Sequence, residues 1–146
     1  MIAAIRIRGR VGVPKEIEDT LYLLRLRRKF SCSLYHEDKI VNGMLEKVKA
    51  YIAYGKINEE TLKVLIEKRG RKKGNRRLDK EEVEKILEEI KKGKKLKELE
   101  KEIGIKPFFR LSPPKKGFKK SIKLLWPKGI LGNIGDEINN LILRMV

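Results

Sequence analysis

The sequence has very little of what catalytic and disulfide-bonded sites are made of. Its 146 residues include one cysteine, Cys32, and one histidine, His36. A single cysteine excludes an internal disulfide and any zinc site built from several cysteines, which is typical of a reducing compartment. No run approaches the roughly 18 apolar residues of a membrane span, and arginines interrupt the first ten residues where a signal peptide would be apolar. We therefore expect a cytoplasmic protein without a membrane partner.

Catalytic chemistry has few candidates. Cys32 lies four residues before His36, and a buried structural cysteine explains it better than a nucleophile does. His36, Glu37 and Asp38 are adjacent, and three adjacent ligands cannot easily converge on one ion, so a metal-dependent nuclease is the weakest function considered. The segment GRKKGN lacks the spacing of a phosphate-binding loop. We predict a protein that is not an enzyme, with no catalytic site, metal, cofactor or small-molecule substrate.

Acidic residues are scarce relative to basic ones. Lys and Arg number 37 against 20 Asp and Glu, a net charge of +17, while 40% of the residues are hydrophobic, enough for one proper core. Such a surplus calls for an anionic partner. We expect nucleic acid rather than a membrane surface, because no long basic amphipathic helix carries Trp or Phe on its apolar face. Glutamine is absent while Lys and Glu abound, which is typical of hyperthermophiles.

Residues 1–57 have the pattern of a compact α/β unit. Ala3, Ile5 and Ile7 alternate with Ala4, Arg6 and Arg8, which predicts a strand with one buried face and one basic face. Apolar residues at helical spacing predict helices from Pro14 to about Leu26 and from about Val41 to Ile52. Strands are expected at 30–35 and 53–57.

Residues 58–146 change to helices and loops. Asn58 and Asp79 are suited to cap two helices, Gly70 to end the first of them in a left-handed conformation, and a shorter helix is expected over 96–103. Residues 105–129 hold four of the five prolines and eight cations without an acid, which predicts a basic extension with a short strand at 108–111. The lysines of this extension could neutralise RNA phosphates.

A Gly-x-x-Gly pair occurs in ILGNIGDEINNLI, residues 130–142. The pair resembles the loop with which K-homology domains grip a nucleic-acid backbone. Asp136 and Glu137 follow it, however, and would repel phosphate. We expect instead a tight turn, an Asp136 that either caps the helix or complements its positive end, and a terminal helix docked by its apolar stripe. The stripe consists of Ile138, Leu141, Ile142 and Met145.

Several separated segments together are similar to one family, the L-thirty family of large-subunit ribosomal proteins, in the longer archaeal and eukaryotic form whose eukaryotic member is called L-seven. The segments are LRLRRKFSCSLY (24–35), NGMLEKVKAYIAYG (42–55), NEETLKVLIEKRGRKKGNRRL (58–78), FRLSPPKKGFKK (109–120) and LGNIGDEINNLILRM (131–145). One departure is that the family often has a basic residue between its two glycines, where this chain has Asn133 and Ile134.

The resemblance implies an α+β fold. It consists of a ferredoxin-like βαβαβ core (1–57) with a three-stranded antiparallel sheet and helices on one face. A C-terminal addition (58–146) contains the helical part, the basic extension and the terminal helix, packed on the core as one globular unit. The implied function is that of a ribonucleoprotein component in translation: a structural constituent of the cytoplasmic large ribosomal subunit, with ribosomal RNA and neighbouring ribosomal proteins as partners.

The residues expected to bind RNA form four basic groups that contact phosphates and 2′-hydroxyls and read shape more than base identity. They are Arg6, Arg8 and Arg10 at the first strand; Arg25, Arg27, Arg28 and Lys29 after the first helix; Arg69, Arg71, Lys72, Lys73, Arg76 and Arg77 in a loop; and Arg110, Lys115, Lys116, Lys119, Lys120 and Lys123 in the extension. The alternative is a free-standing RNA-binding regulator outside the ribosome.

Overall fold

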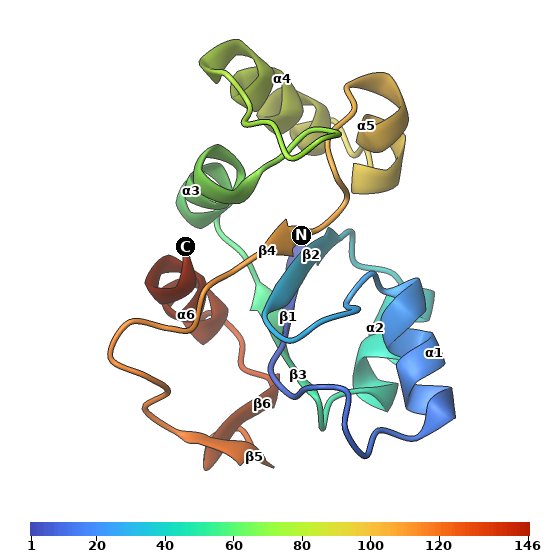
Figure 1. Ribbon diagram of the computed structural model, residues 1–146, viewed down its shortest axis with the longest axis vertical. Coiled ribbons are helices and arrows are strands. Elements are labelled where there is room, and N and C mark those ends of the chain that lie inside the picture. Colours follow the sequence, from blue (N-terminus) through green and yellow to red (C-terminus); the bar gives the residue numbers. More distant parts are fainter.

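The computed structural model describes residues 1–146 as helices packed around one mixed β-sheet (Figure 1). The strands are β1 (Ile2–Arg6), β2 (Ser31–Tyr35), β3 (Ile52–Lys56), β4 (Phe109–Arg110), β5 (Ser121–Leu125) and β6 (Gly129–Asn133). The helices are α1 (Lys15–Leu23), α2 (Lys39–Lys47), α3 (Glu59–Arg69), α4 (Lys80–Lys91), α5 (Leu96–Glu102) and α6 (Glu137–Met145). The predicted α+β class is confirmed, and no helix is long and apolar enough to cross a membrane.

The sheet is wider than the sequence suggested. β1 pairs antiparallel with β2 and β3, as expected, but the strand order is β4-β2-β1-β3-β6-β5 and β6 runs parallel to β3. The prediction of a three-stranded antiparallel sheet is therefore wrong. Its cause lies in 105–133, where β4 has only two residues and prolines flank β5, so the alternation that marks a strand is too short to stand out.

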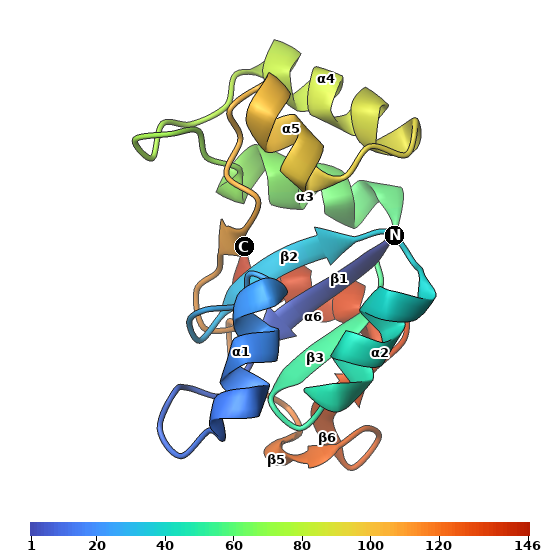
Figure 2. The same cartoon turned by 90° about the vertical axis from the view of Figure 1, so that its right-hand side faces the viewer.

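Helices cover both faces of the sheet, not one as expected. α1 and α2 lie on one face, and α6 lies on the other (Figure 2). Ile2 and Ala4 pack with α1 and α2, whereas Ala3 and Ile5 pack in a cluster of 24 buried residues that includes α6. Each fully buried aliphatic side chain stabilises the fold by about 1.5–3 kcal/mol. β1 is thus buried on both faces, and the prediction that one of its faces is exposed and basic is wrong.

Helix ends follow local chemistry. Asn58 Oδ1 accepts a hydrogen bond from the Thr61 amide and Asp79 Oδ1 one from the Glu82 amide, both at 2.8 Å, which confirms the two predicted caps. Gly70 does end α3, but in an extended conformation with φ of −63°, so the left-handed ending predicted there is wrong.

The Gly-x-x-Gly segment includes the end of β6 and the turn that leads to α6. Gly132 and Gly135 have φ of 85° and 58°, which is the conformation that favours glycine. The amide of Ile134 donates to the Tyr54 carbonyl oxygen at 2.8 Å and fixes the turn to β3. The predicted stripe of α6 is buried, as expected. Asp136 precedes the helix without a side-chain hydrogen bond to it, so the capping alternative is wrong. The other alternative, that its charge complements the positive helix end, stays a prediction.

Candidate nucleic-acid interface

The cationic group after α1 is presented by a left-handed helix ending. The amide of Leu26 donates to the Leu21 carbonyl at 2.9 Å and that of Arg25 to the Tyr22 carbonyl at 3.0 Å, with Arg25 at φ of 64°. This is the hydrogen-bond pattern of a Schellman motif. Leu21 and Leu26 are both fully buried and close the turn by apolar contact. The cations beside Leu26 therefore face outward.

The cationic loop after α3 is a small hairpin. Arg71 bridges Arg77, the Lys72 amide donates to the Arg76 carbonyl at 2.7 Å, and Asn75 adopts a φ of 62° at the tip. Lys73, Arg76 and Arg77 are exposed, as expected for an interface.

The other two cations of this loop are less available. Lys72 forms an ion pair with Glu82, and Arg71 is half-buried. Burial, followed by the nearby charges of Arg77 and Arg69, lowers the pKa of the Arg71 guanidinium. A bound anion would relieve the repulsion among these three cations.

β4 brings the two cationic groups together. Phe109 is fully buried, and the alternation of a strand sends Phe108 and Arg110 to the opposite side. The Arg110 guanidinium carbon lies 5.9 Å from the centre of the Phe108 ring. On one side, the amide of Lys106 donates to the Arg71 carbonyl at 2.8 Å and ties this segment to the hairpin. On the other, Arg110 pairs in register with Ser31 of β2.

Two hollows adjoin at Phe108 and Arg110, and together we call them the arginine groove. One has a volume of about 160 Å³ and the other about 180 Å³. The first is lined by Arg69, Arg71, Asn75, Lys106, Phe108 and Arg110, and the second by Arg10, Arg25, Arg27, Arg28, Ser31, Phe108 and Arg110. Neither lining contains an acid, so the groove attracts anions.

Several arginines of the groove are held by internal acceptors. Arg69 donates to Ser112 Oγ at 2.8 Å and Arg10 to the Arg27 carbonyl at 3.0 Å. Arg25 Nη1 lies 3.5 Å from Glu100 Oε2 and forms an ion pair with it. Guanidinium groups held in this way lose less side-chain freedom when an anion binds.

Arg6 does not belong to this surface. Its side chain is fully buried and its guanidinium group donates to Glu18 and to three backbone carbonyl oxygens. The sequence pattern placed it among RNA-binding residues, but α1 covers the face of β1 from which it projects, and no N–H remains free. Arg8 is exposed and lies 5.2 Å from the Tyr51 ring.

The basic extension forms a separate cationic surface beside α6. Its predicted residues, Lys115, Lys116, Lys119, Lys120 and Lys123, are all exposed. The amide of Lys115 donates to the Arg144 carbonyl at 2.9 Å and the amide of Ser112 to the Met145 carbonyl at 3.0 Å, which anchors the extension to α6. Lys120 Nζ lies 4.5 Å from the Trp126 ring. The extension therefore passes α6 on its way from β4 to β5 (Figure 1).

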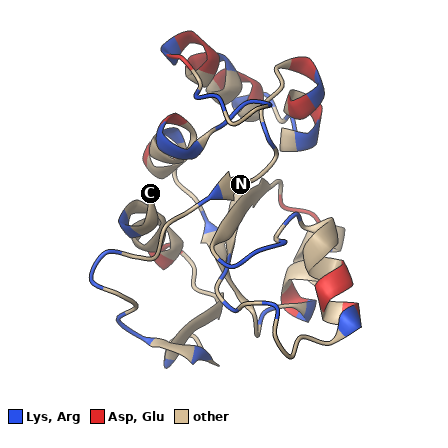
Figure 3. Cartoon of the chain, in the orientation of Figure 1, with Lys and Arg blue, Asp and Glu red and all other residues tan.

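Charges are segregated over the molecule. Figure 3 shows Asp and Glu mainly on the helices, whereas the hairpin and the long connection from β4 to β5 carry Lys and Arg alone among charged residues. The acids of α4 and α5 pair with neighbouring lysines, for example Glu102 with Lys94 at 2.7 Å. This separation leaves the loop surfaces with most of the uncompensated positive charge.

Four residues of the groove were not predicted: Ser31, Asn75, Lys106 and Phe108. The signal for Phe108 was available, because in PFFR one phenylalanine must point inward and the other outward if the segment is a strand. The proximity of Lys106 to Arg71 had no sequence signal, since it depends on a bridge between residues 33 positions apart, Lys72 and Ile105.

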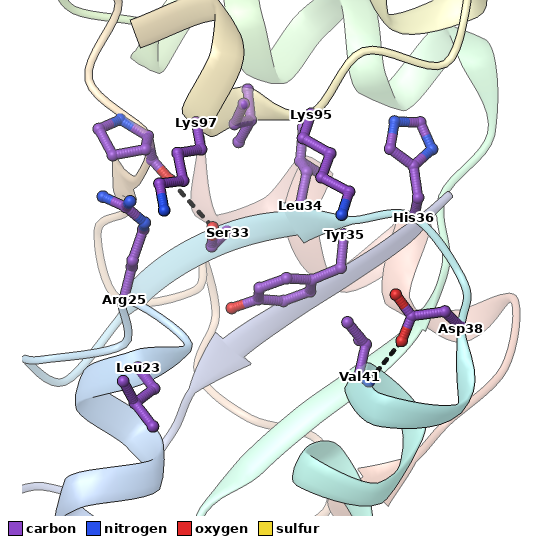
Figure 4. A pocket seen from close by; sticks show the side chains of 12 residues that line it. Leu23, Arg25, Ser33, Leu34, Tyr35, His36, Asp38, Val41, Lys95 and Lys97 are labelled. Carbon is purple, nitrogen blue, oxygen red and sulfur yellow. Dashed lines mark hydrogen bonds between the residues drawn. The ribbon is translucent and has the colours of Figure 1, made fainter.

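A further hollow of about 150 Å³ lies between β2 and α5 and contains the only histidine (Figure 4). His36 Nε2 is 2.8 Å from the Lys94 carbonyl oxygen, and Asp38 accepts from the Val41 amide at 2.7 Å to begin α2. Figure 4 shows these two side chains pointing in different directions. Cys32 is fully buried, and burial raises the pKa of its thiol above the ordinary value, which disfavours the nucleophilic thiolate.

Comparison of the sequence with known proteins places the chain in one class. A model of the family described as Ribosomal protein L30p/L7e matches residues 2–52. Large ribosomal subunit protein uL30 of Aeropyrum pernix is 45% identical over 157 residues, which cover 100% of this chain and 99% of that one. The corresponding proteins of Archaeoglobus fulgidus and Nanoarchaeum equitans are 43% and 45% identical, with 99% and 100% of this chain and 99% of each relative covered. The chain belongs to the L30p/L7e family.

Proposed function

We propose that this chain is a structural constituent of the large ribosomal subunit, in the cytoplasm, and that it binds ribosomal RNA through the arginine groove and the basic extension. The observation that carries the RNA-binding site is the groove itself, where cations from four distant segments meet around one aromatic ring with no acid in the lining. Full-length similarity to large-subunit proteins supports the ribosomal role.

The chemistry of the groove suits a folded RNA backbone. Arginine presents a planar fork of N–H donors that matches phosphate oxygens, and such charge-assisted hydrogen bonds are about twice as strong as neutral ones. Cations on separate elements can follow phosphates that are far apart in the RNA sequence but close in its fold. The protein acts by holding RNA segments together, and this role requires no catalytic group.

We also propose that the core (1–57) and the addition (58–146) act as one unit in the subunit, with neighbouring ribosomal proteins as further partners. The larger apolar cluster supports this arrangement, because it combines Ala3 and Ile5 of β1 with Leu65 of α3 and Ile138 of α6. A rigid body of this kind fixes the distance between the groove and the extension.

Sedimentation of a native lysate tests the ribosomal role. The protein should travel with the large subunit in constant stoichiometry, and should stay with it when low magnesium separates the two subunits. A chain found mainly at the top of the gradient would instead be a free-standing RNA-binding regulator. The variant with Arg71, Lys72, Lys73, Arg76 and Arg77 replaced by Ala should be depleted from the large-subunit fractions relative to wild type.

A further inference from the structure

We infer that the Phe108 ring stacks on an unpaired base of the bound RNA, with phosphates flanking that base held in the two hollows of the arginine groove. This inference rests on the proposed RNA-binding function and adds the kind of RNA feature that the groove selects. That feature is a loop, a bulge or a strand end of the RNA, and not a continuous double helix.

The placement of Phe108 is unusual among the four phenylalanines. Phe109 is fully buried in the larger apolar cluster, and Phe30 and Phe118 pack against that cluster. Phe108 belongs to neither cluster and is the one hydrophobic residue in the lining of each hollow. A partly exposed ring that belongs to neither apolar cluster and lies among cations would best fit a ligand with a flat apolar face.

The ring is held in position from below. Phe109 anchors β4 in the core and pairs with Cys32 of β2. Pro107 is buried, and its carbonyl oxygen accepts a hydrogen bond from Ser33 Oγ at 3.0 Å. Phe108 is therefore fixed on both sides by buried neighbours. A pre-positioned ring loses little freedom on stacking.

A base that stacks on Phe108 while its flanking phosphates occupy the two hollows must be unpaired. Each is large enough for a phosphate group, and each holds several cations beside Phe108. In a continuous double helix the base faces are covered by neighbouring base pairs and cannot reach a ring on a protein surface. An unpaired base exposes its face, and the phosphates on its two sides are then available to the two hollows. Stacking on aromatic side chains is the usual way in which proteins hold such bases.

The test uses the full-length protein and two short RNA duplexes of equal length, one fully paired and one with a single bulged 2-aminopurine, a fluorescent base quenched by stacking. Wild type should bind the bulged RNA more tightly and quench its fluorescence. Phe108→Leu, which keeps an apolar side chain without the ring, should weaken binding to the bulged RNA by about 5- to 100-fold and abolish the added quenching. Its affinity for the paired duplex should change less than twofold, and Phe108→Tyr should restore both properties.

The outcomes separate this inference from the proposed function. If Phe108→Leu binds both RNAs as wild type does, or loses affinity for both equally, the stacking role is wrong. In either case, sedimentation of Phe108→Leu with the large subunit would leave the ribosomal role intact. Circular dichroism melting of each variant identifies any loss of binding caused by unfolding.

Discussion

Arg6 and Phe108 have unusual environments for their residue types, because the arginine is buried and the phenylalanine is partly exposed. The arginine is fully buried and donates all five of its guanidinium N–H bonds internally, two of them to Glu18 at 2.9 Å. The phenylalanine is partly exposed in a cationic groove. A buried guanidinium costs much desolvation energy, so it is stable only because every donor is satisfied. The two residues therefore have different roles: Arg6 stabilises the fold, and Phe108 is proposed to contact RNA.

Replacing Arg6 should destabilise the protein. Arg6→Met leaves the buried Leu26 carbonyl and the Glu18 carboxylate without their donor, although Glu18 keeps about a third of its side chain exposed (35%) and can regain water. We expect a loss of about 2–4 kcal/mol in the free energy of unfolding. Arg8→Met replaces an exposed cation two residues further along the chain, and it should lower the free energy of unfolding by less than about 1 kcal/mol. Urea denaturation measures both, and equal losses would contradict the structural role of Arg6.

Glu18 should give this pair a pH dependence. Hydrogen bonds from Arg6 hold the pKa of Glu18 below its ordinary value, despite an opposing effect of burial. A lowered pKa in the folded state means that the stabilisation is complete above the unfolded-state pKa, about 4.3, and is lost as pH falls through the folded-state value. The stability difference between wild type and Glu18→Gln should therefore be constant above about pH 5.5 and shrink toward pH 3. A difference independent of pH would show that the carboxylate charge contributes nothing.

At the level of helices and strands, the sequence predicted the features that depend on residues within one segment. The caps at Asn58 and Asp79, the α/β order of the first 57 residues and the buried stripe of α6 are all local patterns of side-chain chemistry and spacing. β5 and β6 were not predicted because β6 is held in the sheet by β3, far away in the sequence, and β5 in turn pairs only with β6. Burial of Arg6 escaped for a similar reason, since an alternating strand does not reveal whether helices cover one face or two.

The terminal helix offers a test of the turn that precedes it. Ile138 is fully buried in α6, whereas Leu143, on the same helix, is 45% exposed. Ile138→Asp removes apolar burial and places a charge in the core, so we expect a loss of at least about 4 kcal/mol and a melting temperature lower by on the order of 10 °C. Leu143→Asp should lower it by no more than about 2 °C. Unchanged melting of Ile138→Asp with loss of RNA binding would instead favour a direct role of the Gly-x-x-Gly turn at RNA.

For the molecule as a whole, a net charge of +17 is tolerated because opposite charges meet on the helices while the loops remain cationic. Such a distribution raises the rate of encounter with RNA and makes affinity depend strongly on salt. If about six phosphates are neutralised, the logarithm of affinity should fall with the logarithm of salt concentration at a slope of roughly −4 to −5.

The hairpin should contribute a defined part of that slope. Replacing Arg71, Lys72, Lys73, Arg76 and Arg77 by Ala should flatten it by about 2–3, because Lys73, Arg76 and Arg77 are exposed while Lys72 is paired with Glu82 and Arg71 is half-buried. A charge-matched control replaces five exposed lysines in or next to α4 and α5, namely Lys85, Lys91, Lys92, Lys97 and Lys101. This control should leave the slope within about one of wild type; equal flattening in both variants would remove the hairpin from the site.

The position of α6 under the sheet also determines when this protein can finish folding. The face of β1 that carries Ala3 and Ile5 is covered by Ile138, Leu141 and Ile142, more than 130 residues later in the chain. At synthesis rates of about 5–20 residues per second, the apolar face stays uncovered for on the order of ten seconds after β3 has been made. During that interval the nascent chain has an adhesive surface and a strongly cationic character at the same time. We therefore expect the nine residues of α6 to complete the core and to lower the tendency of the nascent chain to aggregate.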